Sequence, residues 1–421
     1  MLLIKNGHIV SPENSLDGVF DILIENDKIS RIAESITVNC EAIDAKGKYV
    51  FPGFVDMHVH LRDPGFTHKE DVFTGCEAAV AGGVTSVLAM PNTSPSVDSP
   101  ETVKYILDKA KDAKAKVYTV GCITKGMQGD ELTDMKALKE AGIIAVSDDG
   151  RPVKNAKTMS LGMHLADENN LLTISHCEDL DLIDGGIIHK GSVSEALGVK
   201  GMTRASEDSI TAREICIADA ENLPIHIAHV STEGSVAIIR DAKKRGIKVT
   251  CETCPHYFIL DHENLLKRDA DYRMNPPLRE KTDINAVTEG IIDGTIDCIV
   301  TDHAPHSADE KSDFLKAPNG VVGLETSFAA SYTYLVDTKR ITLKRLVELM
   351  SVNPSKLLKI EGGVLKEGAF ADLCIADLDK EWEVDPQKLH SKSKNSVFKG
   401  MKLKGKIICT VVNGEVKFKE E

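Results

Sequence analysis

The chain has 421 residues, and its 51 Lys and Arg against 65 Asp and Glu give a formal net charge of −14. Hydrophobic residues make up 42% and charged residues 28%, a balance that excludes disordered, collagen-like and low-complexity proteins. The acidic balance, with no long basic cluster, argues against nucleic acid as a partner, and an anionic substrate would need a local cation to hold it.

Both ends of the chain alternate apolar and polar residues in the manner of β-strands. Asn6-Gly7 near the start and Asn413-Gly414 near the end supply the chemistry of hairpin turns. Because isolated short hairpins are only marginally stable, we predict that residues 1–52 and 361–421 pair into one small β-sandwich domain. Two unrelated β tails are the alternative.

Between these ends, short apolar runs alternate with amphipathic helical patterns, which is typical of βα units with parallel strands. Eight such strands can close on themselves and leave no sheet edge, so an α/β protein with a (β/α)8 TIM-type barrel is predicted over residues 53–360. The eight runs cover 54–60, 84–90, 116–121, 142–147, 171–176, 223–229, 247–252 and 297–301. The expected helices include 101–115, 130–141, 156–169, 206–222 and 232–245.

The first run of the barrel carries a His-x-His-x-Arg pattern. Side chains two apart on a strand share a face, so His58, His60 and Arg62 are expected to point toward the barrel axis or its mouth. This pattern alone is weak evidence for a metal, because two ordinary strand histidines explain it equally well. Donors at the ends of other runs strengthen it.

Three later runs also stop at side chains that can bind metal. The fifth run ends at His176, the sixth at His229 and the eighth at Asp302. Active sites of (β/α)8 barrels lie at the C-terminal ends of the strands. Four histidines and an aspartate suit Zn²⁺ or another transition metal and leave room for water. The residues therefore predict a metal centre at the barrel mouth.

The fourth run ends in Asp148 and Asp149, and a carboxylate can link two metal ions. An acidic turn is the ordinary explanation, since Asp-Gly pairs are common turn formers. The position at a strand end favours a role in the site. Two-residue periodicity does not choose between the two aspartates, because bulges and strand ends break the alternation.

The ten cysteines follow no regular framework. A chain of this size can bury a large core, so reduced thiols are expected in place of disulfides. No apolar run approaches the ~20 residues that a bilayer span requires, and the first ten residues lack a basic leader with a long apolar stretch. A cytoplasmic protein without a membrane partner is predicted.

Taken together, the motifs resemble the amidohydrolase superfamily and, within it, the class I dihydroorotases of pyrimidine biosynthesis. The resemblance covers nearly the whole chain, and the motifs around Arg62, Asn92 and Asn275 are narrower than the generic His-x-His. The motifs that carry it are GFVDMHVHLRDPG, AMPNT, SDDG, ISHCED, AHVST, CPHY, MNPPLR, TDHAPH and PNGVVGLET.

The resemblance implies reversible hydrolysis of the dihydroorotate ring amide to N-carbamoyl-L-aspartate, with one or two Zn²⁺ per subunit. Asp302 matches the family's catalytic aspartate. The bridging carboxylate is assigned to Asp149 by its spacing to His176, and Asp148 is the alternative. The family's metal ligands fall on His58, His60, Asp149, His176, His229 and Asp302. Its substrate-binding groups fall on Arg62, Asn92, Asn275, His306, Gly320 and Val321.

Two rival functions stand beside this one. Other cyclic amidases (dihydropyrimidinase, hydantoinase, allantoinase) are similar in fold and histidine ligands but usually carry a carboxylated lysine as the bridge, and an uncharged ring would leave Arg62 and Asn92 idle. A non-catalytic scaffold homologue typically loses ligands that are all present here. The resemblance also implies a homodimer that can associate with aspartate transcarbamoylase. The polar stretch 307–320 is expected to be mobile.

Overall fold

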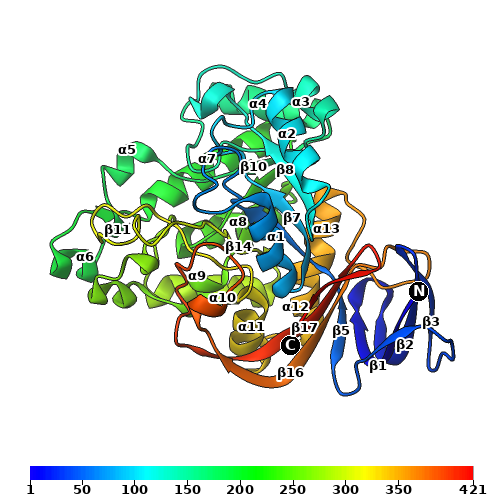
Figure 1. Ribbon diagram of the computed structural model, residues 1–421. Helices are drawn as coiled ribbons and strands as arrows, with labels where there is room; N and C mark the ends of the chain where they lie inside the picture. Colours follow the sequence, from blue (N-terminus) through cyan, green and yellow to red (C-terminus); the bar gives the residue numbers. More distant parts are fainter. Residues whose placement is uncertain (421) are drawn as a thin grey trace.

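The computed structural model describes residues 1–420 and shows a barrel with a second sheet beside it (Figure 1). The parallel strands of the barrel lie in the order β15-β14-β13-β10-β9-β8-β7-β6. The two ends of this sheet meet through a bridge between Val59 and His303, where the His60 N–H donates to the His303 carbonyl at 2.8 Å. The structure confirms the predicted (β/α)8 architecture.

Each of the eight predicted runs overlaps a barrel strand, although two of these strands are only two residues long. The strands are β6 (Phe54–Val59), β7 (Val84–Ala89), β8 (Lys116–Gly121), β9 (Ala145–Val146), β10 (Leu172–Ser175), β13 (Ile225–Ile227), β14 (Val249–Thr253) and β15 (Cys298–Ile299). An added two-stranded sheet contains β11 (Ile188–His189) and β12 (Gly201–Met202).

The helices surround the barrel, and short ones occupy the loops that follow the strands. Those in the first half of the chain are α1 (Val72–Ala81), α2 (Pro100–Ala110), α3 (Met135–Ala141), α4 (Ala156–Glu168), α5 (Leu180–Ile183) and α6 (Ser192–Leu197). The later ones are α7 (Ala205–Glu221), α8 (Glu233–Lys244), α9 (Pro255–Ile259), α10 (Lys281–Asp293), α11 (Ser327–Ser331), α12 (Leu343–Val347) and α13 (Asn353–Leu358).

Local signals fix where the helices begin. The Ser99 side chain accepts the Thr102 N–H at the start of α2, and a proline occupies the first helical position. The predicted helix at 130–141 begins only at Met135, because the Asp134 side chain accepts the Ala137 N–H and so caps the helix there. Capping residues therefore account for the difference between the predicted and observed boundary.

The second sheet is built from both ends of the chain. Its order is β18-β17-β16-β5-β1-β2-β3, with β4 paired to β1 outside this path. Antiparallel pairing of Val50 with Ile375 joins the N-terminal strands to the C-terminal ones. The strands are β1 (Leu2–Ser11), β2 (Leu16–Glu25), β3 (Lys28–Ala33), β4 (Glu41–Asp44), β5 (Tyr49–Pro52), β16 (Leu373–Glu383), β17 (Lys402–Val412) and β18 (Glu415–Lys419). The two ends thus share a sheet, as the sequence predicts.

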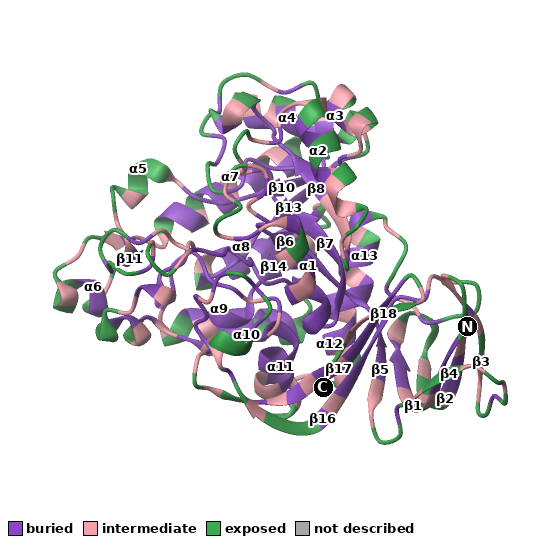
Figure 2. Cartoon of the chain, in the orientation of Figure 1, coloured by how far each residue is buried: buried purple, intermediate pink, exposed green. Residues whose placement is uncertain are grey.

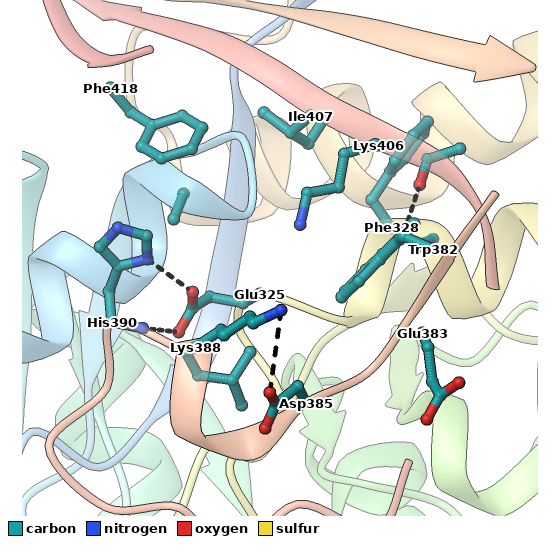
Figure 3. Close-up of a pocket in the computed structure, with 14 residues that line it drawn as sticks. Glu325, Phe328, Trp382, Glu383, Asp385, Lys388, His390, Lys406, Ile407 and Phe418 are labelled. Carbon is teal, nitrogen blue, oxygen red and sulfur yellow. Dashed lines mark hydrogen bonds and ion pairs between the residues drawn. The ribbon is translucent and has the colours of Figure 1, made fainter. Parts of the chain in front are cut away.

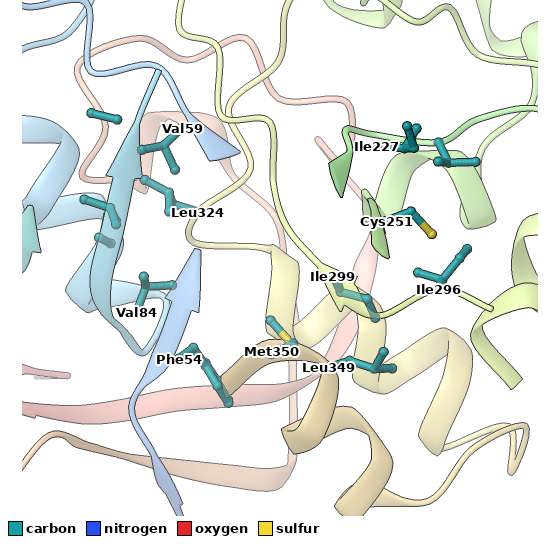
Figure 4. Close-up of a cluster of buried hydrophobic side chains, with 14 of the residues drawn as sticks. Phe54, Val59, Val84, Ile227, Cys251, Ile296, Ile299, Leu324, Leu349 and Met350 are labelled. Atoms are coloured by element: carbon teal, nitrogen blue, oxygen red, sulfur yellow. The ribbon is translucent and has the colours of Figure 1, made fainter. Parts of the chain in front are cut away.

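The barrel strands and much of the surrounding helices are buried (Figure 2), and their apolar residues form the core. Phe54 and Val84 from neighbouring strands belong to the same cluster as Ile299, Leu349 and Met350 (Figure 4). Burial of apolar surface is the main favourable contribution to folding, at roughly 25 cal/mol per Å². This packing gives the strand ends a rigid base.

All ten cysteines lie within residues 1–420 and are free thiols, most of them buried. Over the same residues, no helix combines the length and the apolar character needed to cross a membrane.

Candidate active site

The strand ends bring the predicted metal ligands together. His58 lies in β6, and His60 comes directly after that strand. His176 directly follows β10, and His229 comes two residues after β13. Asp302 follows β15 by three residues. All five side chains are buried.

The backbone is strained at three of these strand ends. Arg62, His229 and Asp302 have φ values of 61°, 30° and 46°, in the left-handed region that residues other than glycine rarely adopt. Such strain persists only where the surrounding structure enforces it, and it clusters at functional sites. The chain therefore turns sharply where these side chains leave the barrel.

Asp149 lies between the four histidines. Its Oδ1 is 3.4 Å from His58 Nε2, from His176 Nδ1 and from His229 Nε2. Its Oδ2 is 3.5 Å from His60 Nε2. One carboxylate oxygen thus faces three imidazoles and the other faces the fourth.

Asp148 points away from the histidines. Its Oδ1 accepts the N–H groups of Ile123 and Thr124 at 2.8 and 3.1 Å, and its Oδ2 accepts the Thr124 hydroxyl. Lys154, the nearest lysine in sequence, does not take the bridging place either, because it is exposed and its Nζ lies 3.6 Å from an Asp181 carboxylate oxygen.

The donor set and its burial fit a divalent metal. His58 Nε2 and Asp149 Oδ1 are buried and have no hydrogen-bond partner among residues 1–420. Two groups of donors share Asp149, one with His58 and His60 and the other with His176 and His229, with the ligand atoms of each group within 4.8 Å of one another. Imidazole nitrogens with carboxylate oxygens suit Zn²⁺ and similar ions.

The charges in the cluster keep Asp149 ionised. Burial by itself raises the pKa of its carboxyl, but the charge of His58 and the His176 and His229 imidazoles, each 3.4 Å away, hold that pKa well below its usual range. For the His176 imidazole, burial lowers the pKa, and hydrogen bonds with Asp149 and Glu178 outweigh this and raise it to about 10. The pocket thus concentrates positive charge around one carboxylate.

Two buried carboxylates that were not predicted as site residues contact ring nitrogens of two of the histidines. Glu252 Oε1 lies 2.6 Å from His58 Nδ1, and Glu178 Oε2 lies 3.3 Å from His176 Nε2. Carboxylates in this position orient metal-binding imidazoles. Glu252 could have been predicted as a site residue, because the seventh predicted run ends there and active sites of (β/α)8 barrels lie at the ends of the strands.

A cavity of about 220 Å³ opens beside the cluster. Its walls bring together most of the predicted site residues, but His58 and Val321 are not among the lining residues. The Val321 carbonyl instead accepts the Ala304 N–H at 2.8 Å. The lining consists of His60, Arg62, Asn92, Asp149, Gly150, His176, His229, Asn275, Asp302, Ala304, His306, Asn319 and Gly320. Gly150, Ala304 and Asn319 were not predicted.

Arg62 brings a half-buried cation to this cavity. Its Nε donates to the Pro305 carbonyl at 3.2 Å, and its Nη2 lies 3.2 Å from His306 Nε2. Burial lowers the pKa of Arg62 to about 10, so the guanidinium remains charged at neutral pH.

The neighbouring carboxylates are engaged elsewhere. Asp63 pairs with Lys109 at 2.5 Å. Asp56 accepts the N–H groups of His58 and Thr301. Within the described part of the chain, Arg62 forms no ion pair with either aspartate, which removes the ordinary salt-bridge explanation for a guanidinium at this position.

Asn92 and His306 complete the polar wall. The Asn92 amide oxygen lies 2.8 Å from His60 Nδ1 and accepts its proton, which leaves the amide nitrogen to donate within the cavity. His306 Nε2 lies 2.9 Å from the Asn319 carbonyl. Burial, followed by the charges of Arg62 and Lys69, lowers the pKa of His306 to about 2, so this ring is neutral.

A second cavity, of about 320 Å³, lies between α11 and the strands β16 and β17 (Figure 3). The Glu325 carboxylate there accepts the His390 N–H at 2.7 Å and pairs with the His390 ring at 2.8 Å. Lys406 Nζ stacks 3.7 Å from the Trp382 ring centroid. This larger cavity lacks the histidine and aspartate cluster, so the smaller one is the candidate active site.

The chain resembles known proteins over its full length. A family model described as Dihydro-orotase-like matches residues 47–235. A curated protein named "Dihydroorotase" from Acetivibrio thermocellus is 50% identical over 423 residues, which cover 100% of this chain and 99% of that protein. A second protein of the same name, from Trichlorobacter lovleyi, is 49% identical, with 99% of each chain covered.

A solved structure gives the same picture of the fold. The L-hydantoinase (dihydropyrimidinase) from Arthrobacter aurescens superimposes with a TM-score of 0.89 at 26% sequence identity, covering 99% of this chain and 95% of that one. The fold is therefore common to several cyclic amidases, while sequence identity is much higher to the proteins named dihydroorotase.

Proposed function

The chain belongs to the dihydroorotase family, and from this premise we propose which of its residues bind the metal and the substrate. It is a metal-dependent cyclic amidohydrolase that interconverts dihydroorotate and N-carbamoyl-L-aspartate in pyrimidine biosynthesis. The predicted function is thereby confirmed. The finer assignments below are proposals, including the class I subtype, for which we rely on an aspartate at the bridging place.

We propose that His58, His60, His176 and His229 hold one or two Zn²⁺ per subunit, with Asp149 between the ions. The unpartnered His58 and Asp149 atoms support this assignment. When bound, the metal supplies a hydroxide nucleophile at neutral pH and polarises the carbonyl under attack. Asp302 Oδ1, which lies 3.1 Å from His60 Nε2, completes the set at the cavity wall.

The protein's own groups then bind the substrate and move the proton. Asp302 accepts the nucleophile's proton and delivers it to the ring nitrogen that leaves, so one carboxylate acts first as base and then as acid. Arg62, Asn92 and His306 hold the substrate carboxylate. Asn275, Gly320 and the backbone near Val321 lie along the ring. In the reverse direction the same groups orient N-carbamoyl-L-aspartate for ring closure.

The observation that carries the substrate assignment is the half-buried guanidinium of Arg62 on the cavity wall beside the metal cluster, with both neighbouring aspartates already engaged. Such a cation matches the one feature that separates dihydroorotate from uncharged cyclic amides, its carboxylate. The direct test is to assay ring opening of dihydroorotate beside dihydrouracil, hydantoin and allantoin with the same preparation. Equal rates on the uncharged rings would contradict the assignment.

The bridging role of Asp149 gives a separate prediction. Asp149→Asn is expected to lose bound Zn²⁺, because a neutral amide does not offset the positive charge of bound metal as the carboxylate does, and loss of ligands costs metal affinity and activity together. Asp148→Asn is the matched control and should retain the metal. Elemental analysis of both proteins, purified without chelator, measures the difference.

Two outcomes would contradict the Asp149 assignment. One is stoichiometric metal in Asp149→Asn beside metal loss in Asp148→Asn. The other is reactivation of metal-free protein that depends on bicarbonate, since bicarbonate would be needed to carboxylate a lysine.

We also propose the assembly and location of the protein. The chain divides into a barrel domain at residues 53–360 and a small β domain formed by residues 1–52 and 361–421. A cytoplasmic location is supported by ten free thiols, which reducing compartments preserve. A homodimer that associates with aspartate transcarbamoylase follows from the family resemblance. Sedimentation of the pure chain, alone and mixed with that enzyme, tests both states.

A further inference from the structure

Lys311 is a buried lysine in the loop that follows His306. Only 8% of the residue is exposed. Its Nζ lies 2.9 Å from the Ala270 carbonyl, 3.1 Å from the Arg273 carbonyl and 2.9 Å from the Pro318 carbonyl. An ammonium has three N–H donors and no acceptor, so these carbonyls use all of its donors. A buried charge is costly unless contacts of this kind offset it.

The carbonyls belong to segments that form the wall of the active-site cavity. Arg273 precedes Asn275 by two residues, and Pro318 directly precedes Asn319. Both asparagines line the cavity. The Lys311 ammonium therefore joins two separate stretches of chain immediately beside the residues that they contribute to the site.

We propose that the Lys311 ammonium is a positioning residue, which holds segments 270–275 and 318–320 in the arrangement that binds dihydroorotate. The Arg273 carbonyl also accepts the Gly320 N–H at 2.9 Å, so one carbonyl connects both segments to the ammonium. The ammonium would therefore shape the wall of the active-site cavity without itself contacting the substrate. This inference rests on the substrate site proposed above.

The charges nearby leave the carbonyls as the main partners of the ammonium. The Asp269 and Asp271 carboxylates are both held by Lys399, at 2.7 and 2.6 Å. Burial lowers the pKa of Lys311 to about 7, an effect that Asp271 opposes and Arg273 strengthens. The charged or titratable groups around it are Asp269, Asp271, Arg273, Arg62 and His306.

The first test removes the donors and keeps the stem of the side chain. Lys311→Met is expected to raise the KM for dihydroorotate at least about tenfold, the effect of losing one charge-assisted hydrogen bond, with kcat within about threefold of wild type and metal content unchanged. Lys316→Met is the matched control, because this lysine of the same loop has an 86% exposed side chain. Equal KM values in the two variants would overturn the proposal, and so would joint loss of kcat and metal.

Chemical rescue provides a second test. Lys311→Ala leaves space where the ammonium stood, so added propylammonium is expected to lower its KM toward the wild-type value, and propanol is not. Failure of rescue, or equal rescue by the uncharged alcohol, contradicts a role for the charge.

Wild-type protein offers a test that does not depend on a variant folding. Above the pKa of Lys311 the amine keeps two donors for three carbonyls, so the KM should rise between about pH 6 and about pH 8.5. A flat KM over that range counts against the proposal.

Amide hydrogen exchange separates this inference from the substrate assignment. Without substrate, Lys311→Met should lose protection in 270–275 and 318–320 relative to Lys316→Met. Unchanged protection overturns the Lys311 proposal alone. If protection of these segments depends on Lys311 but the wild-type protein does not open dihydroorotate, the proposed substrate site is wrong. The Lys311 contact would then still hold.

Discussion

Replacing Asp302 by asparagine is expected to lower kcat for dihydroorotate by about 10²–10⁴-fold, the usual contribution of a positioned acid or base. Asp302 lines the cavity and its Oδ1 lies 3.1 Å from His60 Nε2. Burial raises the pKa of the Asp302 carboxyl, but the hydrogen bond with His60 and the charge of His58 lower it to about 2. The carboxylate is therefore ionised at neutral pH and able to accept a proton.

The amide in Asp302→Asn keeps the shape of the side chain and an oxygen that can accept a hydrogen bond, but it has no basic site. Dihydroorotate should still bind, so the loss should lie in kcat and not in KM. Asp309→Asn makes the same change at an exposed position of the following loop and serves as the control. Near-normal turnover in Asp302→Asn, with full metal content, would remove Asp302 from the proton transfer.

The histidines of the site could be predicted because a barrel gathers its strand ends. His176 and His229 follow different strands, 53 residues apart in sequence. A periodic apolar run shows where each strand stops, and the closed parallel sheet then brings the ends together at one mouth. In the structure, His176 Nδ1 lies 2.8 Å from His229 Nε2.

The choice between Asp148 and Asp149 could not be made from periodicity. Strand β9 is only two residues long, so no alternation extends to these positions. In the structure, the N–H groups of Ile123 and Thr124 hold the Asp148 carboxylate away from the histidines. Contacts with a distant loop of this kind leave no local sequence pattern.

Lys311 shows a different limit of sequence reasoning. The stretch 307–320 is polar in composition, and polarity predicts an exposed, mobile loop. Lys311 and Phe314 are nevertheless buried in it. A lysine is buried there because carbonyls from separate segments converge on its ammonium, and such convergence follows from tertiary structure and not from hydrophobic pattern.

Arg62→Met is expected to reduce kcat/KM for dihydroorotate at least tenfold, since each charge-assisted hydrogen bond to a carboxylate contributes roughly 1.5–3 kcal/mol. The chain carries a net charge of −14, so the overall field repels an anionic substrate and a local cation has to hold it. Methionine preserves much of the side-chain volume and removes all the donors. The metal content should stay at the wild-type level, because Arg62 is not among the proposed ligands.

A comparison of charged and uncharged substrates tests whether Arg62 binds the carboxylate of dihydroorotate or only maintains the cavity. Arg62→Met should lose activity on dihydroorotate and leave any slow activity on dihydrouracil unchanged, because the uncharged ring offers no carboxylate to the guanidinium. Arg340→Met removes an exposed guanidinium far along the chain and should change neither rate. Equal losses on the charged and uncharged rings would assign Arg62 to the structure of the cavity, and a silent Arg62→Met would place the carboxylate elsewhere.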